Sequence, residues 1–260
     1  MTPDSLTFLK ALLDTPGPSA FESAPARAWR AESERFVDRV AADAAGNSYA
    51  TVNPDGRPRV MLAGHIDEIG LMVTHVDDEG YVSFDTIGGW DPQVFVGQRV
   101  RLLGRDGPVV GVVGKKAIHL MEKDDRERVS KVEDLWIDIG AANRAEAQER
   151  LRIGDPGVLA AGVLEFPNGR IVSRSIDNRI GAFVVLEALR LLSQERPKAR
   201  VSAAATTREE ISYTGGGART GAAGLEPDVA IVVDVTHATD YPGVEKRKHG
   251  DYKLGGGPVL

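Results

Sequence analysis

Apolar residues recur at helical spacing at the start of the chain and then in a strand-like run. The leucines of segment 5–13 and the apolar positions of segment 22–36 predict two helices. Residues 43–47 are rich in Asp, Gly and Asn, and we expect a turn between two strands there. Residues 60–63 form a continuous apolar run, which predicts a strand buried in the core.

From residue 71 to about residue 164 the pattern changes to short β-rich segments. Turns rich in Gly, Asp and Pro separate them. Only segment 143–151 is predicted to form a helix. The predicted strands are 71–75, 81–85, 99–103, 109–113 and 135–139. Many short strands with little helix indicate a small barrel-like β module.

After residue 170 strands and helices alternate again. We predict a strand over 171–176, a helix over 178–193, a strand over 200–206, and a buried strand over 229–235. A glycine-rich loop and a short helix separate the last two strands. Four apolar side chains of the predicted helix are expected to face the core: Ile180, Phe183, Val184 and Leu191.

The simplest account is an α/β fold interrupted by an inserted domain. Residues 1–70 and 169–260 would form a mixed or parallel sheet covered by helices on both faces. Residues 71–168 would form the inserted small β-barrel.

Composition narrows the possible functions. The chain is 42% hydrophobic and 27% charged, with a net charge of −6, as in an ordinary globular protein without a nucleic-acid or membrane surface. It has no cysteine, which excludes disulfides, thiolate metal sites and cysteine nucleophiles. No apolar run approaches the ~20 residues that cross a bilayer, and residues 1–5 lack a signal-peptide pattern. We expect a cytoplasmic protein.

His65 and Asp67 follow the apolar run 60–63 directly. Residues two apart on an extended backbone point to the same side, so an imidazole and a carboxylate lie together at the end of a core strand. This placement suits a divalent metal site with His65 as ligand and Asp67 as the group that orients it. The alternative is a hydrogen-bonded core histidine and a turn-capping aspartate, and this stretch alone does not decide between them.

Further carboxylates follow the other predicted core strands. Asp177 follows strand 171–176, where an ordinary helix cap is the alternative role. Glu209 and Glu210 follow strand 200–206, and two adjacent carboxylates near a core require a compensating cation unless the loop is solvated. Asp234 ends an apolar run, where a buried carboxylate requires a partner.

These side chains are expected to converge, because ligands gather at the carboxyl ends of strands in open α/β sheets. Nitrogen and oxygen ligands without sulfur suit Zn²⁺, Co²⁺ or Mn²⁺. Five acidic residues exceed the need of one zinc, which favours two metal ions that activate a water molecule for amide hydrolysis.

The order of four motifs resembles the tetrahedral (TET) metalloaminopeptidases, a family that includes deblocking and glutamyl aminopeptidases and some proteins labelled endoglucanases. The resemblance covers nearly the whole chain. The motifs are HIDEIG at 65–70, SIDNRIG at 175–181, EEI at 209–211 and VDVTHA at 233–238.

The resemblance implies roles for the matching residues. His65 and Asp234 would bind one metal ion, Glu210 the other, and Asp177 both. Asp67 would orient His65, and Glu209 would be the general base.

The resemblance also implies a zinc-peptidase-like catalytic domain and a PDZ-like inserted domain. The inserted domain would mediate assembly of dimers into dodecamers. Short peptides would be the substrates.

Two segments depart from the family pattern. The glycine-rich loop 211–218 is longer than usual, which affects the shape of the substrate pocket. Family members continue past the equivalent of 255–260, and that part supplies a last histidine ligand. The second metal site is therefore expected to be incomplete. Four other histidines do not match that ligand: His75, His119, His237 and His249.

Two alternative functions remain. One is a dinuclear metal amidohydrolase or deacylase that acts on another amide. The other is a catalytically weak assembly protein of the same fold.

Overall fold

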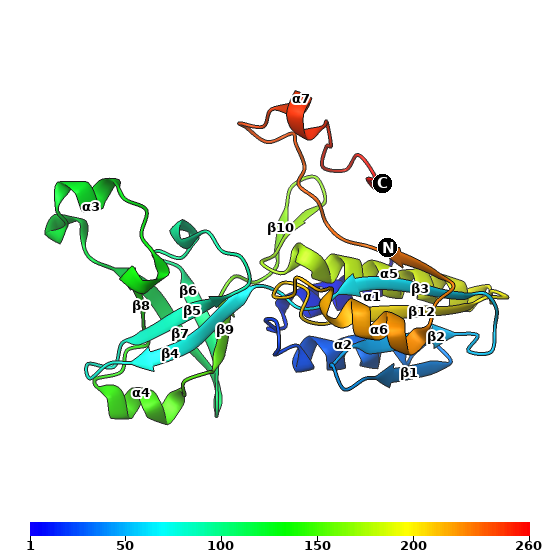
Figure 1. The fold of residues 1–260 in the computed structure, drawn as a ribbon, viewed down its shortest axis with the longest axis horizontal. Coiled ribbons are helices and arrows are strands. Elements are labelled where there is room, and N and C mark those ends of the chain that lie inside the picture. The colour runs from blue at the N-terminus through cyan, green and yellow to red at the C-terminus, as the bar shows by residue number, and fades with distance from the viewer.

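The computed structural model describes residues 1–260, apart from the side chain of residue 125. The chain folds into an α/β domain and a separate β-barrel domain, seen at the right and left of Figure 1. None of the helices described is long and apolar enough to cross a membrane.

A five-stranded mixed sheet forms the centre of the α/β domain. In spatial order its strands are β1 (Arg39–Ala42), β2 (Ser48–Val52), β12 (Arg200–Thr206), β3 (Arg59–His65) and β13 (Val229–Val232). β3 runs parallel to both β12 and β13, whereas β2 runs antiparallel to β12. The predicted mixed sheet is confirmed.

Helices cover both faces of the central strands. Alternate residues of β12 point to opposite faces, so Ala203 and Ala205 pack with α1, α2 and α5, while Ala204 packs on the side of α6. The covering helices are α1 (Pro3–Asp14), α2 (Ser23–Ser33), α5 (Ile176–Gln194) and α6 (Gly216–Leu225), whereas the short α7 (Lys246–His249) lies apart from the sheet (Figure 1).

The β-barrel domain is a closed barrel with its own hydrophobic core. In spatial order its strands are β4 (Gly70–Val76), β5 (Val82–Ile87), β8 (Leu135–Asp138), β7 (Gly107–Lys115), β6 (Arg99–Gly104) and β9 (Pro156–Leu159). Helices α3 (Lys123–Glu127) and α4 (Arg144–Arg150) flank it, with 3-10 turns at Pro92–Val94, Ile118–Leu120 and Val132–Asp134. The pattern missed β9 because its first residue is a proline, and it also missed α3.

The strand predicted over 171–176 is wrong. Only β11 (Arg170–Val172) is extended, and it pairs with β10 (Leu164–Phe166) in a separate two-stranded hairpin. Helix α5 already begins at Ile176. Asp177 and Asn178 have non-helical backbone angles, so Asp177 lies at a kink at the beginning of α5 and not at the end of a core strand.

Several predicted burials are also wrong. Val184 and Leu191 on α5 are 42% and 58% exposed, and only part of the helix surface contacts the sheet. β13 is an edge strand that pairs only with β3, and its side chains are exposed because little besides β3 packs against it. The side chain of Asp234 beyond it is 46% exposed and not buried.

Candidate metal centre

The carboxyl ends of three neighbouring strands bring the predicted residues together. His65, the last residue of β3, is in register with Thr206, the last residue of β12. On the other side of β3, Val232 of β13 is in register with Ala63. Because these strands are parallel, the segments that follow them leave the sheet at the same edge.

The imidazole of His65 lies at the centre of this group and is almost fully buried. Its Nε2 atom is 3.2 Å from Asp177 Oδ1, 3.7 Å from Glu209 Oε2 and 3.9 Å from Asp234 Oδ1. The structure thus brings together His65 and carboxylates from three separate segments.

His65, Asp177 and Glu210 form the tightest set of ligand atoms. One nitrogen or oxygen atom of each lies within 4.8 Å of the others, a spacing that could hold a metal ion. Asp234 is not part of this set, although it lies beside His65 at the carboxyl end of the neighbouring parallel strand β13.

Asn178 fixes the start of α5 against the end of β13. Its side-chain amide donates to the carbonyl oxygen of Val233 at 2.8 Å, and its Oδ1 accepts from the N–H of Gly181 at 3.0 Å. These bonds place Asp177 and Asp234, the neighbours of Asn178 and Val233, on the same side of His65.

Asp67 connects the histidine to the glutamate loop. The side chain is fully buried, and Oδ1 lies 3.3 Å from His65 Nδ1, although the two atoms do not form a well-aligned hydrogen bond. Its carboxylate accepts the backbone N–H groups of Glu209 and Glu210, both at 3.2 Å. The Ser19 hydroxyl donates to Asp67 Oδ2 at 2.6 Å. Asp67 therefore holds the segment with both glutamates beside His65.

The charges at the site favour a bound cation. Burial, together with the charge of Asp177, raises the pKa of Glu210 to about 7. Burial, with the charges of Asp234 and Asp67, raises the pKa of Glu209. Burial lowers the pKa of His65, but Asp177 and Asp67 outweigh it and raise the pKa to about 10. The site thus holds an excess of negative charge that a proton on His65 only partly offsets.

The residues fit divalent metal ions. One imidazole nitrogen and several carboxylate oxygens converge without sulfur, a donor set suited to Zn²⁺, Co²⁺ or Mn²⁺. A cation would replace the proton on His65 and offset the repulsion between the carboxylates.

Sequence reasoning missed the buried ion pairs beneath the site. Arg179 is fully buried, and it donates to Glu68 Oε1 at 2.9 Å and to the carbonyl oxygen of Ile66 at 3.0 Å. Arg174 lies 2.9 Å from the other oxygen of Glu68. Glu68 lies in the motif at 65–70 and Arg179 in the motif at 175–181. Their place in these motifs was the one sequence feature that could have indicated a role at the site.

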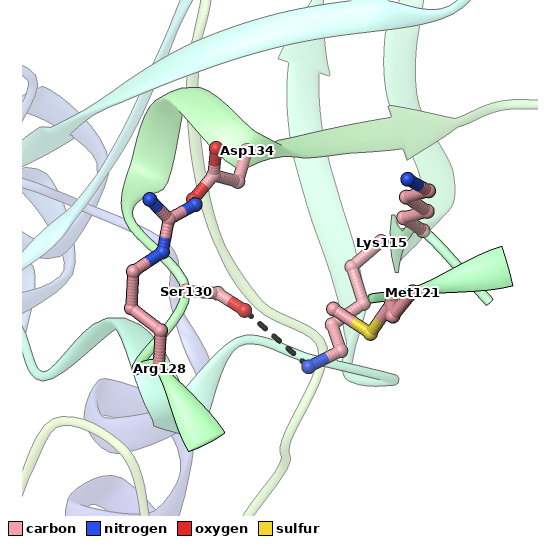
Figure 2. A pocket seen from close by; sticks show the side chains of 6 residues that line it. Lys115, Met121, Arg128, Ser130 and Asp134 are labelled. Atoms are coloured by element: carbon pink, nitrogen blue, oxygen red, sulfur yellow. Dashed lines mark hydrogen bonds and ion pairs between the residues drawn. The ribbon is translucent and has the colours of Figure 1, made fainter. Parts of the chain in front are cut away.

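A cavity of about 280 Å³ lies in the β-barrel domain, away from these residues (Figure 2). In it the ammonium group of Lys115 donates to Ser130 Oγ at 3.3 Å, and Arg128 lies 3.5 Å from Asp134. None of the predicted site residues lines this cavity.

Residues 46–260 match the model of the M42 glutamyl aminopeptidase family. The chain belongs to this family. The resemblance that the four motifs indicated is therefore confirmed, as is the assignment to a family of peptidases.

Similar proteins support the assignment. A lysyl aminopeptidase of Pyrococcus furiosus is 33% identical over 256 residues, which are 97% of this chain and 71% of the relative. A solved TET aminopeptidase from the marine sediment archaeon Thaumarchaeota archaeon SCGC AB-539-E09 is 36% identical, with a TM-score of 0.92 over 98% of this chain and 71% of the other.

The chain spans only part of the length of its relatives. A relative from Escherichia coli (strain K12), 34% identical over 87% of this chain, is covered over 63% of its own length.

Proposed function

We propose that the protein is a metal-dependent aminopeptidase that removes N-terminal residues from short peptides. The observation that carries the proposal is the convergence of His65, Asp177 and Glu210 at one edge of the sheet, in a chain of the M42 family. The names of the relatives, which include lysyl and glutamyl aminopeptidases, support an exopeptidase.

Each site residue has a distinct proposed role. His65, Asp177, Glu210 and Asp234 hold the metal ions, which supply Lewis-acid chemistry at the scissile carbonyl when bound. Glu209 is the general base, because its half-exposed carboxylate faces His65 Nε2 at 3.7 Å and burial raises its pKa. Asp67 orients His65 from the buried side.

A substrate panel tests the activity. Protein loaded with Zn²⁺, Co²⁺ or Mn²⁺ is incubated with aminoacyl-p-nitroanilides, short peptides with a free N-terminus, and the same peptides N-acetylated. We expect release of N-terminal amino acids from the free peptides only. Hydrolysis of the N-acetylated peptides alone would indicate a deacylase, and metal binding without hydrolysis would indicate an assembly protein.

We propose two metal ions of unequal affinity per chain. Among the residues described, Asp177 and Glu210 are the protein ligands assigned to the second ion, fewer than the three usual in catalytic sites. Calorimetric titration of metal-free protein should resolve one tight and one weak site. Two tight sites of similar affinity would contradict this.

We propose that the β-barrel domain, residues 71–168, mediates assembly of identical chains. Its surface carries exposed apolar side chains on β7 and the segment after it: Val110, Val112, Ile118, Leu120 and Val129. Val110 and Val112 lie two residues apart on β7 and therefore on the same face of the strand. One similar solved protein is a dodecamer, and a TET peptidase of Pyrococcus horikoshii can assemble into a tetrahedron or a large octahedral shell. A dodecamer built from dimers is the state that we propose here.

Light scattering tests the assembly. Replacing Val110 and Val112 by serine removes apolar surface without touching the barrel core, and we expect smaller particles. Deletion of residues 71–168 with a short linker should give the same result. An unchanged particle in both variants would contradict this role.

A further inference from the structure

We propose that Glu22 is a positioning residue for the Glu209–Glu210 segment. This inference rests on the proposed function, because its consequence is the placement of the proposed base and of one metal ligand. Glu22 itself is not one of the proposed metal ligands.

The carboxylate of Glu22 joins two loops that are distant in sequence. It is 6% exposed, and its Oε1 accepts the backbone N–H of Ala20 at 2.8 Å and that of Arg208 at 3.0 Å. One oxygen atom thus connects the segment before α2 to the segment after β12.

Both donors have an unfavourable backbone conformation. Ala20 has φ of 73° and Arg208 has φ of 59°, in the left-handed region where residues other than glycine are uncommon. Such conformations persist only where surrounding contacts hold them. The hydrogen bonds to Glu22 are contacts of this kind.

Each of these two residues adjoins a group bound to Asp67. Ser19, before Ala20, donates its hydroxyl to Asp67, and Glu209, after Arg208, donates its backbone N–H to the same carboxylate. The two loops therefore meet twice, once at Asp67 beside His65 and once at Glu22 behind it. The second meeting point fixes the direction in which Glu209 leaves β12.

Capping of α2 does not account for this buried carboxylate. Glu22 occupies the N-cap position of α2, yet its side chain makes no capping hydrogen bond. Within the described part of the chain it also forms no salt bridge. The carboxylate instead accepts the backbone N–H groups of Ala20 and Arg208.

Three variants of the full chain test the proposal. Glu22→Ala removes the acceptor, and Glu22→Gln keeps a carbonyl oxygen at the same place. Glu187→Ala is the matched control, because Glu187 is also largely buried and accepts a hydrogen bond from Ser5, but it connects α1 to α5. Each protein is measured for Tm, for kcat and KM of peptide hydrolysis, and for Co²⁺ affinity and visible absorption.

We expect Glu22→Ala to lower kcat about tenfold to hundredfold with KM within about threefold, the effect of misplacing a reacting group by about 1 Å. Co²⁺ affinity should fall about tenfold, with a changed absorption spectrum, because Glu210 moves with the segment. Glu22→Gln should stay within about threefold of the parent protein. Glu187→Ala should lower Tm without changing kcat or the spectrum.

Two results would overturn the proposal. One is a Glu22→Ala protein with the kcat and cobalt spectrum of the parent, and the other is a Glu22→Gln protein as impaired as Glu22→Ala. If the parent protein hydrolyses no peptide, the proposed function fails, and the cobalt measurements still decide the role of Glu22.

Discussion

Replacing Arg179 by methionine tests whether this buried arginine stabilises the segments that surround the metal centre. The guanidinium group is fully buried and donates to Glu68 Oε1 at 2.9 Å. It also donates to carbonyl oxygens of the helix α1, the loop after it and the end of β3. These carbonyls belong to Leu12, Thr15, Gly17 and Ile66.

The expected loss of stability follows from these contacts. Removing one partner of a buried ion pair costs about 3–5 kcal/mol, because the other charge stays buried. Arg174 remains 2.9 Å from Glu68 and still compensates part of its buried negative charge. We therefore expect a loss of about 3 kcal/mol in the free energy of unfolding, at the lower end of this range. In a protein of this size such a loss lowers Tm by roughly 6–12 °C. The matched control is Arg196→Met, which removes an exposed ion pair with Asp38 and should cost less than about 1 kcal/mol.

Urea unfolding followed by tryptophan fluorescence measures the difference. Trp29 is fully buried in the core of the α/β domain, where its indole N–H donates to the carbonyl of Ala182 at 2.9 Å. Replacing Trp90 and Trp136 by phenylalanine leaves Trp29 as the only tryptophan, so the signal reports the α/β domain. If Arg179→Met and Arg196→Met lower the free energy of unfolding by the same amount, the buried Arg179–Glu68 ion pair does not stabilise these segments.

Three further predictions concern the site and its surroundings. Glu209→Gln should abolish peptide hydrolysis and leave metal content nearly unchanged, and a metal loss equal to that of Glu210→Gln in elemental analysis would show that the two roles are reversed. Ala20→Gly should raise the free energy of unfolding by roughly 0.5–1 kcal/mol, since glycine relieves the left-handed strain at φ of 73° but loses more chain entropy; a lower midpoint in urea would contradict this. Burial raises the pKa of Asp43, but hydrogen bonds from Tyr49 and Asn47 lower it by more, to below its ordinary value of 3.8. This carboxylate therefore contributes stability above pH 3.8 that is lost as the pH falls through the folded pKa. Asp43→Asn should make unfolding less sensitive to acid between about pH 5 and 2, and unchanged pH dependence in urea titrations would count against the assignment.

Local pattern predicted much of the fold because the relevant information lies within short segments. The apolar run that ends at His65 forms β3, and segment 200–206 forms β12 with the predicted bounds. The short strands after residue 70 form the barrel. In each case strand periodicity and turn residues are properties of neighbouring positions, so no distant contact is needed to recognise them.

Local sequence pattern predicted only part of the candidate site. The sequence placed His65 and Glu209–Glu210 after core strands, as observed, and it named Asp177 and Asp234 for the same site. Asp177 reaches His65 from a kink at the beginning of α5 and not from a strand end, and Asn178 bonds this kink to the segment that follows β13. That bond joins positions 55 residues apart, and no local pattern encodes it.

The chain by itself determined most of the strands, the change to short β segments after residue 70, and the motif residues of this protein. Only the tertiary structure decided which residues are buried. β13 is as apolar as a core strand, yet its side chains are exposed because little besides β3 packs against it. Arg179 and Glu22 are charged, yet they are buried because the folded chain supplies hydrogen-bond partners from distant segments. Burial depends on what packs against a residue in space, and hydropathy records only what the residue would favour alone.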